Sequence, residues 1–218
     1  MNNSKNEQNI TKELSTHILG MLVNPIHTMD WSIKKLSKKC TYILILLLSF
    51  LYGIINVLLM QNIAKTAFKY IDTIMGNNYI FGLINKRLMY EIDNYMSWSK
   101  IFIFEIFLFF ISCIIIFLTT YFIFKYVFKC DIRPLCFLQV IVSSFVPFIF
   151  YTLLQLILSY ISFPLSLCAV LIGFILSIIL FFKGLCGCTN VPQDKILMVV
   201  PISYVVMLIV DLAIIKVI

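Results

Sequence analysis

The stretch VSSFVPFIFYTLLQL, residues 142–156, places a proline and several polar residues in a run that is otherwise apolar enough to cross a membrane. A proline inside a helix lacks its N–H donor and displaces the carbonyl four residues earlier, which for Pro147 belongs to Ser143. In hydrocarbon a freed carbonyl is costly unless a nearby group donates to it. Ser143 and Ser144 can re-satisfy this turn, and their small size lets another helix approach closely. The stretch therefore predicts a kinked helix inside a membrane bundle, with Gln155 facing protein.

The composition requires a solvent other than water. Of the 218 residues, 61% are hydrophobic and only 12% are charged, whereas soluble domains are nearer half apolar and a quarter charged. Several segments are apolar and close to the length that spans the hydrocarbon core. They are residues 41–61, 101–124, 135–157, 166–182 and 196–217. We predict an all-α fold, a polytopic membrane bundle of about five transmembrane helices with amphipathic interfacial segments.

The segments outside the spans divide the chain further. Residues 1–12 are polar and are predicted to form a disordered tail. Residues 13–40 form an amphipathic, basic segment, and residues 41–218 form the five-span domain with an amphipathic outer loop over 62–100. This loop is predicted to be a helical hairpin resting on the bilayer surface.

The segment before the first span suits the membrane interface. Tryptophan favours the headgroup level and lysine favours anionic lipid. The predicted interfacial anchors are Trp31, Lys34, Lys35, Lys38 and Lys39, together with Trp98 at the far end of the outer loop. An ordinary polar flank before a span is the other interpretation, and the sequence leaves both open.

The basic residues predict the orientation. Eleven of the seventeen lie before the first span, between the second and third, or between the fourth and fifth. Because cytoplasmic segments carry the excess of lysine and arginine, we expect a multi-pass protein of the cell membrane (of the ER or Golgi membrane if eukaryotic). Its N-terminus is cytoplasmic and its C-terminus outside. This placement at span ends also argues against nucleic-acid binding despite the net charge of +7.

The order of several motifs resembles the Ypt-interacting-protein (Yip) family, in its bacterial five-span form. The motifs are NPIHTMDWSIKK (24–35), SSFVPFIFYTLLQLILSYI (143–161), ILSIILFFKGL (175–185) and VPQDKILMVVPISYVVMLI (191–209). The resemblance implies five spans with a cytoplasmic N-terminus. The acidic-Gly-Pro signature of eukaryotic members, which are implicated in small-GTPase binding and vesicle traffic, is missing. The resemblance therefore implies an architecture and not that role.

Two acidic residues lie inside predicted spans, where acids are costly and mark functional sites by default. Glu105 is about one turn inside the second span, and Asp211 lies in the fifth. On adjoining helices they could share a proton or bind a cation. The other interpretation is structural, with Glu105 reaching the interface near Lys100 and Asp211 pairing loosely with Lys216. The Pro147 kink also has two interpretations: it only shapes helix packing, or it forms a hinge or a cavity wall.

No catalytic constellation is present in the sequence. The seven cysteines are an odd number without framework spacing, so no disulfide scaffold is predicted. Cys186 and Cys188 lack the paired spacing of a structural zinc site, and His17 and His27 are too far apart in sequence to indicate a site. Phosphate loops, nucleophile elbows and metalloprotease helices are missing. We predict no enzyme, no catalytic or metal-binding residues and no cofactor.

Two functional hypotheses from different classes remain. The first is an integral membrane scaffold or adaptor that organises protein or lipid partners. It would contact the lipid bilayer and either a membrane-protein partner or a second copy of the chain. The second is a small permease or an ion- or proton-translocating subunit that uses Glu105 and Asp211. The small number of charges inside the spans favours the first.

Overall fold

The computed structural model describes residues 2–75, 98–130 and 133–217, and every regular element in these ranges is a helix. The N-terminal helices are α1 (Asn2–Val23) and α2 (Pro25–Lys35). The long helices that follow are α3 (Lys38–Met75), α5 (Trp98–Phe122, continued by a π-helical turn Ile123–Val127), α6 (Pro134–Ser159), α7 (Phe163–Cys188) and α8 (Gln193–Val217).

The predicted membrane bundle is confirmed. Five helices are long and apolar enough to cross a membrane. They cover Lys38–Asn62, Trp98–Val127, Pro134–Ser159, Phe163–Cys188 and Gln193–Lys216. Each contains one of the predicted spans or nearly all of it, and the helices extend past the apolar segment because the backbone stays hydrogen-bonded into the polar boundary.

α6 is the central helix of the bundle, since it contacts α1, α2, α3, α5 and α7. In its most apolar window 67% of the residues are buried, compared with 28–33% in the other four spans. The third span is therefore internal, as the serines and proline of its sequence predict. α6 continues as a helix through Pro147, and the Ser144 hydroxyl donates to the carbonyl of Ile141 (2.7 Å) in the preceding turn.

The outer faces of the other spans expose large apolar side chains. Phe107 on α5 is 62% exposed, Leu171 on α7 is 58% exposed, and Leu212 on α8 is 65% exposed. Side chains of this kind around a closed bundle have no favourable solvent except hydrocarbon. The exposed apolar surface thus indicates a membrane environment, as the length and composition of the helices do.

α6 and α7 form a tightly packed antiparallel hairpin because glycines on α7 face large side chains on α6. A Cβ atom added at Gly173 would come within 2.5 Å of the Tyr151 Cβ, and one added at Gly184 would collide with Val140. Small residues of this kind let membrane helices approach closely. The hairpin brings the first turn of α6 beside the last turn of α7.

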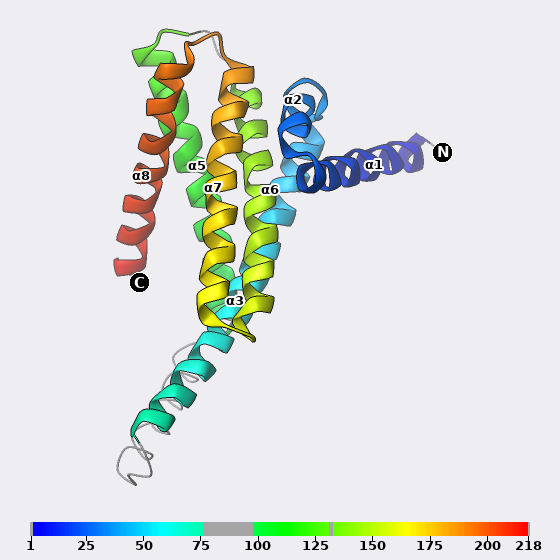
Figure 1. The fold of residues 1–218 in the computed structure, drawn as a ribbon. Helices are drawn as coiled ribbons and strands as arrows, with labels where there is room; N and C mark the ends of the chain where they lie inside the picture. The colour runs from blue at the N-terminus through cyan, green and yellow to red at the C-terminus, as the bar shows by residue number, and fades with distance from the viewer. Residues whose placement is uncertain (1, 76–97, 131–132, 218) are drawn as a thin grey trace.

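The N-terminal helices lie outside the row of spans. α1 projects sideways from the bundle, and α2 stands beside α6 and α7 (Figure 1). The break between them is Asn24–Pro25: Pro25 occupies the first turn of α2, and the Asn24 side chain accepts from the His27 N–H (3.5 Å). Residues 2–12, predicted to be disordered, are instead helical backbone within α1.

α3 continues as one helix to Met75 and extends beyond the bundle (Figure 1). The first arm of the predicted surface hairpin therefore continues the first span rather than folding back on the bilayer. The second arm, over residues 76–97, lies outside the described residues.

Candidate functional site

A buried histidine joins three helices at the N-terminal end of the bundle. His17 of α1 has no exposed surface. Its Nδ1 lies 3.0 Å from the Ser32 hydroxyl of α2, and its Nε2 lies 3.2 Å from the Ser143 hydroxyl of α6. The imidazole also stacks on Trp31, with ring centroids 6.1 Å apart. We call this group, His17 with Ser32 and Ser143, the histidine clasp.

The hydrogen bonds around the clasp assign its tautomer. Ser32 donates its hydroxyl proton to the carbonyl of Thr28 (2.7 Å), so its oxygen accepts from Nδ1–H of His17. Nε2 is then the acceptor for the Ser143 hydroxyl. Burial lowers the pKa of His17 to about 4, although the nearby Glu13 carboxylate partly opposes this. The clasp therefore holds a neutral imidazole at physiological pH.

Three further contacts fix the N-terminal helices. The Glu13 carboxylate accepts from the backbone N–H of Ser37 (2.6 Å). The Gln139 side chain donates to the carbonyl of Leu36 (2.5 Å). Asp30 and Lys183 form an ion pair (3.8 Å), which is half exposed and contributes little by itself. Together with the clasp, these contacts tie α1 and α2 to α3, α6 and α7.

Sequence reasoning missed the clasp. His17 and His27 were set aside as too far apart in sequence to indicate a site, and His27 is exposed. The usable signal was Asn24–Pro25, which ends one helix and starts the next. A reversal at that point brings the segment around Ser32 back beside His17. The third partner, on the distant α6, carries no local signal.

Glu105 is buried and paired across helices. It is 7% exposed, and its Oε2 accepts from the Asn56 side chain of α3 (3.1 Å). The hydrogen bond of Glu105 therefore joins it to an amide, and not to Lys100 or to a second carboxylate. An amide that donates to an acid across two membrane helices stabilises their packing modestly.

Asp211 of α8 lies at a cavity lined by residues of α5, α6, α7 and α8, together with Tyr52 of α3. Its Oδ2 accepts from the Ser112 hydroxyl (2.9 Å), and its buried Oδ1 has no partner among the described residues. The cavity measures about 310 Å³, and beside Ser112, Asp211 and Tyr52 its wall is apolar. Ser112 is seven residues from Glu105 on α5, a rise of about 10 Å. The two acids therefore have separate partners, and no ion pair joins Asp211 to Lys216 in the described part of the chain.

Polar pairs join other spans as well, each of them between hydroxyl or amide groups. They are Asn62–Ser159, Thr120–Ser203 and Ser177–Tyr204. Two further polar residues of α6 face protein: Gln155, as predicted, is 9% exposed, and Thr152 is buried and donates to the carbonyl of Phe148 (2.8 Å). The three pairs between spans therefore use their hydrogen-bonding capacity on helix packing, whereas Thr152 bonds within α6.

The predicted interfacial anchors differ in their exposure. Trp31 is half-buried against the clasp, and Trp98 begins α5 and is also half-buried. The four lysines at the end of α2 and the start of α3 are exposed: Lys34, Lys35, Lys38 and Lys39. Only Trp31 is brought to the candidate site itself.

The structure corrects the interpretation of the cysteines. A disulfide joins Cys136, in the first turn of α6, to Cys188, at the end of α7. No disulfide was predicted because the two cysteines are 52 residues apart and share no framework spacing. Their proximity follows from the α6–α7 hairpin, whose two helices have equal lengths of 26 residues and so end side by side.

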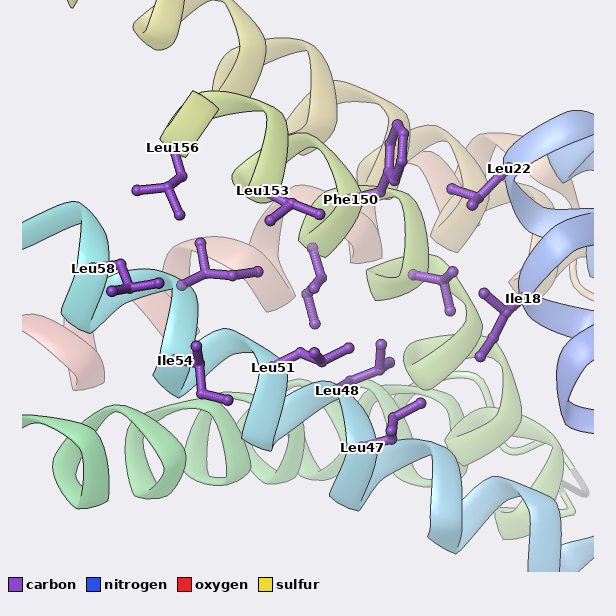
Figure 2. Close-up of a pocket in the computed structure, with 13 residues that line it drawn as sticks. Ile18, Leu22, Leu47, Leu48, Leu51, Ile54, Leu58, Phe150, Leu153 and Leu156 are labelled. Carbon is purple, nitrogen blue, oxygen red and sulfur yellow. The ribbon is translucent and has the colours of Figure 1, made fainter. Parts of the chain in front are cut away.

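An apolar groove runs between α3 and α6 and is closed at one end by α1 (Figure 2). It measures about 240 Å³, and all of the residues that line it are apolar. Ile18 and Leu22 of α1 point into it from one end, and Leu58 and Leu156 lie at the other (Figure 2). The groove is distinct from the Asp211 cavity and shares no lining residue with it.

These features define a polytopic helical membrane protein whose N-terminal helices are docked on its central span. The family model of the Yip1 domain matches residues 19–215. The chain therefore belongs to the Yip1-domain family, and the resemblance noted from its motifs is confirmed. No match was found among curated proteins or among solved structures.

Proposed function

We propose that this protein is a membrane scaffold or adaptor without catalytic activity of its own, and that the N-terminal helices are its binding element. The observation that carries the proposal is an apolar ridge on these helices, formed by Leu19, Val23 and Ile26. Their side chains are 61%, 84% and 54% exposed. Because the histidine clasp holds the helices in place, the ridge is presented in one orientation, which lowers the entropic cost of binding.

The polar groups within the spans support a structural role. The hydroxyls and acids within the spans mostly bond to neighbouring helices. A bundle of this kind can position partners within a membrane, and we propose a membrane-embedded protein or a second copy of this chain as the partner of the ridge.

We propose the cell membrane as the location, with the N-terminus in the cytoplasm. The basic residues before the first span support this orientation. It places the docked helices, the lysines and the Cys136–Cys188 pair on the cytoplasmic side, where thiols are normally kept reduced. The redox state of this pair in the cell is thus a test of the orientation.

Site-specific photo-crosslinking in intact membranes tests the scaffold function. A crosslinking amino acid is placed at Val23 on the ridge, and at Ile175, an exposed residue of α7 that lines neither cavity, as the matched control. We expect a reproducible protein adduct from Val23 and none from Ile175. The adduct should weaken in His17→Phe, which loosens the clasp. Equal adducts at both positions, or lipid adducts alone, would contradict the scaffold function.

The Asp211 cavity favours a second candidate function, a small permease or an ion- or proton-translocating subunit. Asp211 has a buried oxygen without a partner and lines a cavity of about 310 Å³ inside the spans. An unpaired carboxyl in such a place is costly and marks a candidate proton or cation site.

The double variant Glu105→Gln with Asp211→Asn separates the two functions. Both changes preserve side-chain shape and remove the charge. A scaffold should insert normally and retain its Val23 adduct, and purified protein in liposomes should give no proton flux above empty liposomes. Proton flux from the wild type that the double variant abolishes would favour translocation.

A further inference from the structure

The groove between α3 and α6 has the chemistry of a hydrocarbon site. Apolar cavities of this kind exclude water, because water placed in them finds no polar partners. The groove is lined by six residues of α3, five of α6 and two of α1, all aliphatic except Phe150. Several of these side chains, including Leu51 at 38% and Leu153 at 41%, are exposed at the surface of the bundle. The groove is therefore open to the bilayer along its side.

The length of the groove corresponds to one leaflet. Its α3 wall runs from Leu47 to Leu58, a rise of about 16 Å along the helix. The hydrocarbon core of a bilayer is about 30 Å thick, so one acyl chain occupies a depth of about 15 Å. A single chain lying parallel to the helices would fill the groove from its α1 end to Leu58.

A cluster of positive charge lies beyond the closed end of the groove, since Lys39 is eight residues from Leu47, or about 12 Å along α3. The Glu13 carboxylate of α1 bonds to the N–H of Ser37, and Ser37 lies between Lys34, Lys35, Lys38 and Lys39. Of the two acids in this region, Asp30 pairs with Lys183, and Glu13 bonds to an uncharged N–H, so one carboxylate stands against the four lysines. The exposed lysines therefore give this end of the bundle a net positive charge, which is complementary to an anionic headgroup.

We propose that the groove is a binding site for one anionic phospholipid. An acyl chain lies between α3 and α6 under Ile18 and Leu22, and the phosphate-bearing headgroup lies against the lysines at the α2–α3 junction. α1 forms the end wall, so the site exists only while the N-terminal helices are docked. This binding stands apart from the scaffold function, since the groove and the ridge use different faces of α1.

Native mass spectrometry on the full chain tests the proposal. The protein is exchanged into lipid-free detergent and incubated with dioleoyl phosphatidylglycerol or with dioleoyl phosphatidylcholine, which has the same chains and no net charge. We expect one phosphatidylglycerol to be retained in preference to phosphatidylcholine. No retained lipid, or equal retention of the two, would overturn the proposal.

Two tryptophan substitutions on α3 locate the acyl chain. Leu51→Trp fills the groove, whereas Leu46→Trp adds the same side chain at a residue that is 60% exposed and does not line the groove. We expect Leu51→Trp to abolish retention and Leu46→Trp to leave it unchanged. Leu153→Trp fills the groove from α6 and replaces Leu51→Trp if that variant does not fold. Retention in the filled variants at the wild-type level would overturn the acyl-chain site.

Charge substitutions locate the headgroup. Lys38→Gln with Lys39→Gln should reduce the preference for phosphatidylglycerol by about fivefold per lysine, the factor that corresponds to 1 kcal/mol. Lys125→Gln with Lys129→Gln, a matched pair of exposed lysines elsewhere on the chain, should leave the preference unchanged. Equal loss in both double variants would indicate non-specific attraction and overturn the headgroup assignment. The Val23 crosslink is measured in each variant, so that failure of the lipid site is distinguished from failure of the scaffold function.

Discussion

Substitution of His17 by phenylalanine should release the N-terminal helices from the bundle without unfolding it. Phenylalanine keeps a ring in the buried space and removes both hydrogen bonds, to Ser32 and Ser143. Each bond contributes about 1 kcal/mol net, so the docked state should lose about 2 kcal/mol. That difference increases the population of the undocked state about thirtyfold. His27→Phe, at an exposed histidine in the same segment, is the matched control.

Backbone hydrogen exchange measured by mass spectrometry reads this opening directly, because local unfolding exposes amides to exchange in proportion to its population. In His17→Phe, peptides from α1 and α2 should exchange about thirtyfold faster than in the wild type, with α7 unchanged. His27→Phe should match the wild type throughout. Wild-type exchange in α1 and α2 of His17→Phe would refute the clasp.

The pH dependence of the same exchange is an independent check on the histidine. Burial lowers the pKa of His17 to about 4 from 6.5, so the docked state favours the neutral imidazole. Its contribution is complete above pH 6.5 and is lost progressively as the pH falls towards 4. Between pH 7.5 and 5.5 the loss is about 1.4 kcal/mol, or a tenfold increase in opening after correction for intrinsic exchange rates. His17→Phe should show no such increase, and a flat wild-type profile would refute the assignment of the neutral form.

Three other predictions concern the bundle. Gly184→Val places a side chain against α6 where no space exists, and it should destabilise the protein by about 1–3 kcal/mol and lower its Tm in detergent; an unchanged Tm would contradict the close packing. Glu105→Leu should lower the Tm because it leaves the Asn56 amide unpaired, with a cost of about 0.6–1.7 kcal/mol, whereas Glu105→Gln should retain most of the stability. The Cys136–Cys188 bond predicts five reactive thiols in unfolded, unreduced protein and seven after reduction. If this end of the bundle faces the cytosol, blocking thiols in intact cells should modify all seven cysteines.

The fold was predictable because hydrophobicity and helix length are local properties of the chain. The five spans follow from apolar runs that are each long enough to cross hydrocarbon. The interior position of α6 follows from Ser143, Ser144 and Pro147, since polar groups in a membrane must face protein. The basic segment before the first span, with Trp31, is likewise recognisable from local composition. None of these inferences requires knowledge of which helices pack together.

The sequence predicted some residues of the candidate sites but not their contacts, because each contact joins segments that are distant in the sequence. Glu105 and Asp211 were recognisable as unusual, but their partners Asn56 and Ser112 are 49 and 99 residues away. A polar residue in a span indicates that some partner is needed and does not identify it.

The sequence by itself determined that this chain is a five-span helical membrane protein of the Yip type, with a basic N-terminal segment before the first span. Only the tertiary structure decided that His17 bridges Ser32 and Ser143, that the α6–α7 hairpin joins Cys136 to Cys188, and that α1 closes a groove between α3 and α6. The physical reason is that burial in a bilayer depends on the composition of each segment, whereas hydrogen bonds and cavities depend on which faces of distant helices meet.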